Sequence, residues 1–254
     1  MPMAEAGPGL TETHILSIPM PVNAFPLVTE VLDALEASLS PERMTTYLAA
    51  AGGDREQALR LYTWNTAVSA AFYGPLQGLE VALRNAMNRE LARIYGPDWY
   101  DNPGAGLDLG ALERIGGAKK ELAKGGYPID PPHLVAALSF GFWVTLLGSG
   151  GRSQTPGSPK RNYEMTLWRP ALHRAFPHAK LSRRAAHQPL DFPRTFRNRI
   201  AHHEPIFNRH LEADYRQILA VTGWICPSTR NWIAHHSRVE QMLQMAKDSD
   251  GIAF

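Results

Sequence analysis

Residues 76–94 decide the fold: Leu-Gln-Gly-Leu-Glu-Val-Ala-Leu-Arg-Asn-Ala-Met-Asn-Arg-Glu-Leu-Ala-Arg-Ile. Large apolar side chains recur every four residues within this stretch, at Leu79, Leu83, Met87 and Leu91. Such spacing places them on one face of an α-helix. Gly74-Pro75 precedes the stretch and Gly96-Pro97 follows it, and we expect these pairs to bound the helix.

The same helical spacing appears along most of the chain. It predicts further helices at 29–39, 41–52, 55–73, 112–122, 134–147, 190–203, 211–224 and 229–245, with a short helix or turn at 168–176. No stretch combines alternating polarity with β-branched residues, which is the pattern of a strand. The chain is therefore expected to be all-α.

One domain is expected. Residues 1–22, rich in Pro, Gly and Thr, are predicted to be a loose leader, 23–246 a single helical domain, and 247–254 a tail. Within the domain, 148–161 is expected to be a flexible loop, because Gly, Ser, Pro and Gln dominate it.

Composition narrows the class of protein. The chain has 254 residues and a single cysteine, so neither an intrachain disulfide nor a Cys-rich zinc site can form. The N-terminus lacks the basic and apolar regions of a signal peptide. The longest apolar run, 134–147, would rise only about 21 Å as a helix, against roughly 30 Å for a bilayer core. We expect a cytoplasmic protein without membrane contact.

Positive charge gathers in one window. Residues 169–209 hold nine Lys and Arg against two acids, a net of +7, whereas the whole chain carries +2. Five of the ten histidines lie there too. A basic, histidine-bearing segment suits a face that binds a polyanion. An ordinary solvated face with scattered arginines fits the same charges.

The candidate chemistry lies at 196–203, Phe-Arg-Asn-Arg-Ile-Ala-His-His. Asn198 and His202 are four residues apart and share a helix face, while Arg197 lies roughly 140° round from His202. Histidine can take or give a proton near neutral pH. Arginine can bind a phosphate and stabilise the charge that develops on it. One helix end could thus supply the groups for cleaving RNA without a metal.

Simpler readings of these residues stay open. Asn and His pairs one turn apart occur by chance, and a histidine near a helix C-terminus also stabilises the helix dipole. His202-His203-Glu204 with His210, and His235-His236, lack good metal-ligand spacing. Cys226 reads as buried, and Gly148-Ser-Gly-Gly-Arg152 lacks the Lys-Ser/Thr of a phosphate loop. We expect neither a metal nor a cofactor.

Residues 190–207, which contain Arg-Asn-x-x-x-His, resemble the Abi-like (abortive infection) branch of the HEPN ribonuclease superfamily. Two other segments agree with the resemblance: 79–89, which carries Glu80, Arg84 and Asn85, and 138–147 with its Phe-Gly-x-Trp. The pattern Trp224-Ile-Cys-Pro followed by Trp232-Ile also fits. Together the segments cover about residues 60–240.

The resemblance implies a HEPN-type helical bundle with additional helices, acting as a homodimer that brings two copies of the motif into one cleft. It implies metal-independent endoribonuclease activity in phage defence, by attack of the ribose 2′-hydroxyl on the adjacent phosphate. A non-cleaving module that binds RNA or protein is the alternative, and an antitoxin or regulatory RNA is a further possible partner.

Residue by residue, the resemblance makes Arg197 and His202 catalytic, with Asn198 positioning them. Supporting or substrate-binding roles fall to Glu80, Arg84, Asn85, Arg199 and His203. A structural ion pair and a helix-surface amide explain Glu80, Arg84 and Asn85 equally well.

Overall fold

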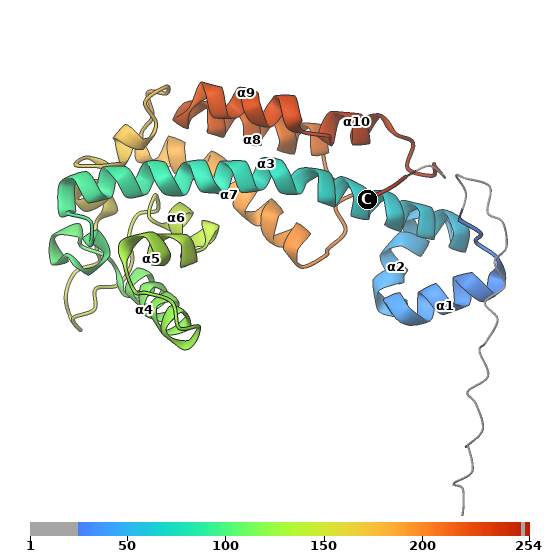
Figure 1. The fold of residues 1–254 in the computed structure, drawn as a ribbon, viewed down its shortest axis with the longest axis horizontal. Coiled ribbons are helices and arrows are strands. Elements are labelled where there is room, and N and C mark those ends of the chain that lie inside the picture. Colours follow the sequence, from blue (N-terminus) through green and yellow to red (C-terminus); the bar gives the residue numbers. More distant parts are fainter. Residues whose placement is uncertain (1–24, 250–251) are drawn as a thin grey trace, which may run out of the picture.

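The computed structural model describes residues 25–249 and 252–254, and all regular structure in this part of the chain is helical (Figure 1). The expected all-α class is confirmed, whereas the expected leader, 1–22, lies outside the described residues. The helices are α1 (Thr29–Leu39), α2 (Pro41–Ala50), α3 (Arg55–Tyr95), α4 (Leu109–Lys124), α5 (Pro131–Ala137), α6 (Phe140–Thr145), α7 (Arg183–Ala201), α8 (Leu211–Ile225), α9 (Pro227–His236) and α10 (Val239–Gln244).

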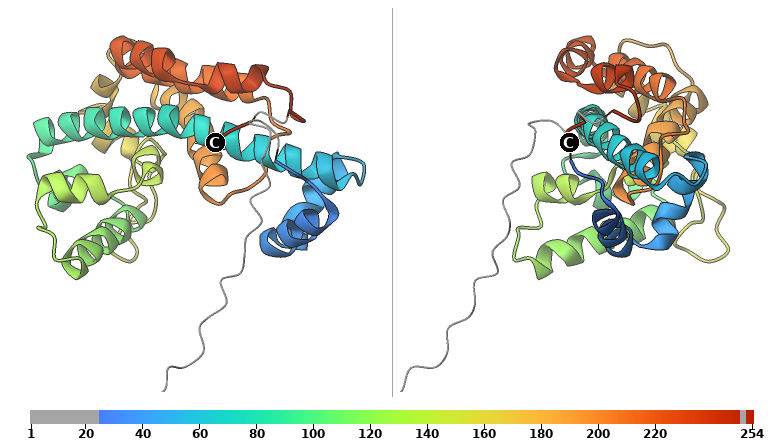
Figure 2. Two further views of the ribbon diagram at one scale, coloured as in Figure 1. Left: turned by 45° about the vertical axis from the view of Figure 1, so that its right-hand side comes forward. Right: turned by 90° about the vertical axis from the view of Figure 1, so that its right-hand side faces the viewer.

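Helix α3 is the axis of the molecule. Its 41 residues span about 60 Å, with α8, α9 and α10 along one side and α4 to α6 along the other (Figures 1 and 2). Helix α7 packs against both α6 and α8 and crosses α3. Helices α1 and α2 cover the N-terminal end of α3, where Met44 and Tyr47 of α2 form a small second core with Ala58 and Leu59 of α3.

The break expected at Gly74-Pro75 is wrong, because α3 continues through it. A proline inside a helix costs about 3 kcal/mol through its lost hydrogen bond and its clash with the preceding turn. Here Pro75 is buried, and the neighbouring turns bury Phe72, Leu76 and Leu79. Burying each large apolar side chain stabilises the fold by about 1.5–3 kcal/mol, so tertiary packing outweighs the local cost.

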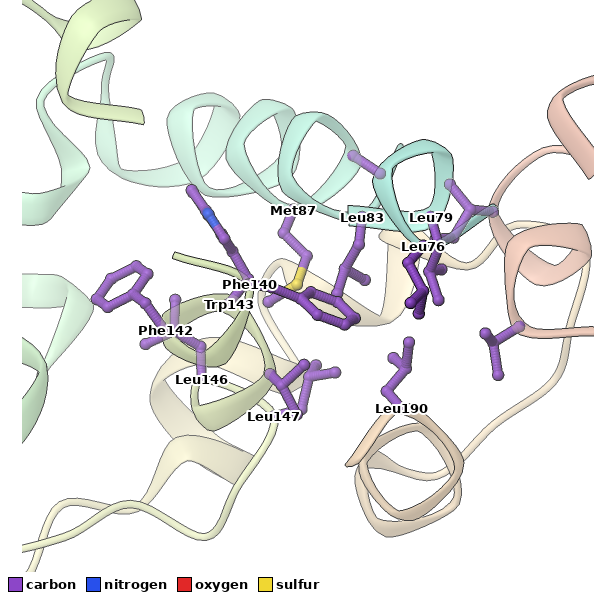
Figure 3. Packing of buried hydrophobic residues seen from close by; sticks show 14 of the residues in the cluster. Leu76, Leu79, Leu83, Met87, Phe140, Phe142, Trp143, Leu146, Leu147 and Leu190 are labelled. Carbon is purple, nitrogen blue, oxygen red and sulfur yellow. The ribbon is translucent and has the colours of Figure 1, made fainter. Parts of the chain in front are cut away.

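The single helix expected at 134–147 is also wrong, because the chain breaks into α5 and α6. Leu138 is extended, and the Ser139 hydroxyl accepts a hydrogen bond from the Phe142 amide as the cap of α6. Serine favours such a cap over a helix interior. The break turns Phe140 and Trp143 toward Leu83 and Met87 of α3 (Figure 3).

Other boundaries differ as well. Helix α7 begins at Arg183 rather than Leu190, capped by Ser182, and includes two prolines. The helix expected at 229–245 divides into α9 and α10 at Ser237. The expected 168–176 element is a π-turn, η3 (Glu164–Trp168), and a 3₁₀ turn, η4 (Leu172–Ala175).

Segment 148–161 is irregular, as expected, but backbone hydrogen bonds tie its two ends together. The Arg161 amide donates to the Gly151 carbonyl at 2.8 Å, and the Tyr163 amide donates to the Ser149 carbonyl at 3.2 Å. In the described ranges 25–249 and 252–254, no helix has the length and apolarity needed to cross a membrane.

Candidate functional site

The end of α7 is a Schellman motif. The Glu204 amide donates to the Arg199 carbonyl at 2.9 Å, and the His203 amide donates to the Ile200 carbonyl at 3.0 Å. The motif requires a left-handed residue after the cap, usually glycine. His203 occupies that position with φ of +55°. A non-glycine residue held in this conformation is strained, and such strain concentrates at functional sites.

Three side chains fix the loop that follows. Arg43 of α2 donates to the His203 carbonyl at 2.7 Å. Arg199 bonds both the Glu204 carboxylate and the Pro205 carbonyl, each at 3.0 Å. Asn65 of α3 accepts the Ile206 amide at 2.8 Å from a buried position. The turn that carries His202 is therefore held from three separate helices.

A groove of about 750 Å³ runs between α3 and the C-terminal end of α7. The α3 wall carries polar and aromatic residues, and the α7 wall carries Arg197, Ile200 and Ala201, with His203 beyond the helix end. Arg197 Nε lies 3.8 Å from Glu80 Oε2 across the groove. The residues of the α3 wall are Tyr62, Asn65, Thr66, Ser69, Ala70, Tyr73, Leu76, Gln77 and Glu80.

Asn198 and His202 are exposed on the face of the α7 end that adjoins the face of Arg197. Neither residue lines the groove. Neither side chain makes a hydrogen bond or ion pair with a residue that the structure describes. Successive residues are about 100° apart on a helix, so Arg197 and Asn198 cannot face the same way. Within one protomer, the three motif residues are close but do not converge on one point.

The other expected site residues separate. Glu80 and His203 line the groove. Arg199 is engaged in the turn. Arg84 lies one turn beyond Glu80, and its buried Nε has no hydrogen-bond partner among the described residues. Asn85 lines a different hollow, formed with Trp232 and His236 of α9.

The positive charge of 169–209 is partly neutralised by acids from within and outside the window. Arg169 and Arg183 both pair with Glu164, and Arg209 pairs with Asp214. Arg194 and Arg199 pair with Asp191 and Glu204 within the window. The count of +7 already includes Asp191 and Glu204, so among these acids only the charges of Glu164 and Asp214 make it overstate the field at this surface. The ion pair of Arg197 with Glu80, at 3.8 Å, is longer than each of the pairs above.

Sequence reasoning missed Arg43, Asn65 and Tyr73. Asn65 did carry a signal, since it is a polar residue flanked by Trp64, Ala67 and Val68 on a buried helix. Arg43 and Tyr73 carried none, because their importance depends on contacts and exposure that only the tertiary fold creates.

In the described ranges, no group of three or more His, Cys, Asp or Glu side chains gathers where it could hold a metal ion. No family model, curated protein or solved structure matches this chain.

Proposed function

We propose that the protein is a HEPN-type endoribonuclease that cleaves RNA without a metal, at a cleft that two protomers complete. One observation carries the proposal. Among the described residues, Asn198 and His202 at the exposed end of α7 have no side-chain partner and Arg197 has only a long ion pair with Glu80, while the neighbouring Arg194, Arg199 and Arg209 are paired with acids. Groups kept free at the end of a rigid helix are available to a substrate.

The chemistry is a transesterification. His202 of one protomer takes the proton from the 2′-hydroxyl and returns it to the leaving 5′-oxygen, while Arg197 of the second protomer contacts the same phosphate. The 2′-oxygen bonds to phosphorus and the bond to the 5′-oxygen breaks, leaving a 2′,3′-cyclic phosphate and a 5′-hydroxyl. Arg197 stabilises the charge on the phosphoryl oxygens, and Asn198, one turn before His202, orients the imidazole.

The divergent faces of Arg197 and His202 support the two-protomer arrangement. A two-fold axis repeats the same patch on both subunits, so the arginine of one can meet the histidine of the other. The resemblance to Abi-like proteins adds phage defence, and control by an antitoxin or regulatory RNA, to the proposal.

The test uses purified protein with tRNA and rRNA in EDTA, beside His202→Ala. We expect cleavage by the wild type, products with cyclic phosphate ends, and a loss of about 10²-fold or more in the variant. Equal cleavage by both proteins, or none by the wild type, would refute the nuclease. RNA binding without cleavage by either would favour the alternative, a non-cleaving binding module.

A further inference from the structure

The α3 wall of the groove carries an exposed aromatic ring. Tyr73 has 66% of its surface exposed, although Phe72 and Leu76 beside it are buried. Its ring has no aromatic or hydrogen-bond partner among the described residues. A large ring left in solvent on the wall of a groove is available for a flat ligand to stack on.

Polar groups suited to a base edge lie beside this ring. Gln77 is one turn from Tyr73 on the same wall, exposed, and without a side-chain hydrogen bond in the described part of the chain. Ser69, one turn before Tyr73, donates its hydroxyl to the Asn65 carbonyl at 2.7 Å, which leaves the oxygen able to accept. An amide and a hydroxyl can read the donors and acceptors of a base.

The opposite wall suits a phosphate. Arg197 and His203 lie there, and among the described residues that line the groove Glu80 is the only acid. Ile200 and Ala201 on this wall, and Leu76 on the α3 wall, add apolar surface. Ligand sites of this size commonly combine apolar walls with a few placed polar groups. The groove thus has a stacking ring on one side and a guanidinium on the other.

We infer that this groove binds an unpaired nucleobase of the RNA, stacked on Tyr73 and contacted by Gln77, while Arg197 holds a neighbouring phosphate. The inference rests on the proposed function, since it assigns the substrate of that site. Such a groove selects unpaired RNA, because the bases of a duplex are stacked on their neighbours and are not free to stack on a side chain.

The test measures binding in the His202→Ala background, so that the probe survives. A fluorescein-labelled unstructured RNA, alone or annealed to its complement, is titrated in EDTA at fixed salt and followed by anisotropy. Tyr73→Ala should weaken binding of the unpaired strand about 5- to 150-fold, the range for loss of one stacked base. Tyr73→Phe should bind like the parent, because stacking needs the ring and not the hydroxyl.

Tyr127→Ala is the matched control. Tyr127 is similarly exposed, at 61%, and lies between α4 and α5, outside the groove, so its loss should leave RNA affinity unchanged. Equal affinities of Tyr73→Ala and the parent would overturn the inference, as would failure of the parent to bind the unpaired strand. It would also fail if Tyr73→Ala abolished dimerisation, since the groove would then be a protomer interface.

The two proposals fail separately. Cleavage of unpaired RNA that is indifferent to Tyr73, measured with His202 intact, would remove the base site and leave the nuclease. Tyr73-dependent binding with no cleavage by the wild type would remove the nuclease and leave the base site.

Discussion

His203 takes a left-handed backbone conformation, φ +55°, at the residue after the α7 cap. An L-residue pays roughly 1–2 kcal/mol there relative to the right-handed region, whereas glycine does not. We expect His203→Gly to be more stable than His203→Ala by about 1 kcal/mol, because both lose the imidazole and only glycine relieves the strain. Urea denaturation of the two variants measures the difference. Equal midpoints and slopes would contradict the left-handed turn.

Asn65 supplies the second prediction. Its exposed fraction is 5%, and its Oδ1 accepts the Ile206 amide. Asn65→Leu keeps the approximate volume but leaves that amide buried and unpaired, which should lower the free energy of unfolding by about 1–3 kcal/mol. Thr66→Val at the adjacent, less buried position is the control. The Thr66 hydroxyl donates to the Tyr62 carbonyl within α3 rather than to the α7 turn. A loss no larger than that of the control would rule out the anchoring role.

At the scale of single residues, the sequence predicted the features of the site that depend only on the local geometry of the helix. That Arg197 faces away from Asn198 and His202 follows from the helical angle between neighbours. The contacts of Arg43 and Asn65 with the α7 turn join residues 160 and 141 positions apart. No local pattern encodes such contacts, because they arise when α2 and α3 pack beside the loop.

At the scale of helices, apolar spacing predicted where helices lie better than where they end. Pro75 was expected to break a helix because propensity rules count the local cost of proline and omit the burial that offsets it. The reverse occurred at Ser139, where a strongly apolar run concealed a helix cap. Both differences matter for the site: a continuous α3 provides the whole groove wall, and the α5–α6 break seats α6 against α7.

The last turns of α3 give a pH-dependent prediction. Glu90 is almost buried and bonds Arg93 at 3.0 Å and Arg89 at 3.3 Å. Burial by itself raises the pKa of this carboxyl, but the two guanidinium groups together lower it below its ordinary 4.5. A lowered pKa contributes stability that is present above pH 4.5 and lost as pH falls through the folded-state pKa.

Glu90→Gln should therefore destabilise the protein by about 1 kcal/mol near neutral pH, a modest value because both arginines reach solvent. The gap from wild type should close as pH falls below 4.5. Thermal unfolding across that range measures it, with the exposed Glu113→Gln as control. A gap that stays constant or widens in acid would show that the charge of Glu90 contributes nothing.

At the scale of the whole molecule, the proposed catalytic residues of one protomer lie on two neighbouring faces of the α7 end. Arg197 faces the groove and Glu80, whereas Asn198 and His202 face solvent on the adjoining strip of α7. The proposed dimer accounts for this arrangement, because a two-fold axis through the α7 ends would place Arg197 of one copy beside His202 of the other.

Mixing two inactive variants separates these arrangements. Arg197→Ala and His202→Ala each remove one half of the site, and both positions are exposed, so the fold should survive. In a subunit-exchanged equal mixture, half of the dimers are mixed, and each of those keeps one intact arginine–histidine pair across the interface. Activity should return to about one quarter of wild type, since one of two sites works in half of the dimers. A site contained within one protomer gives no recovery, and neither does a chain that sedimentation shows to be only monomeric at micromolar concentration.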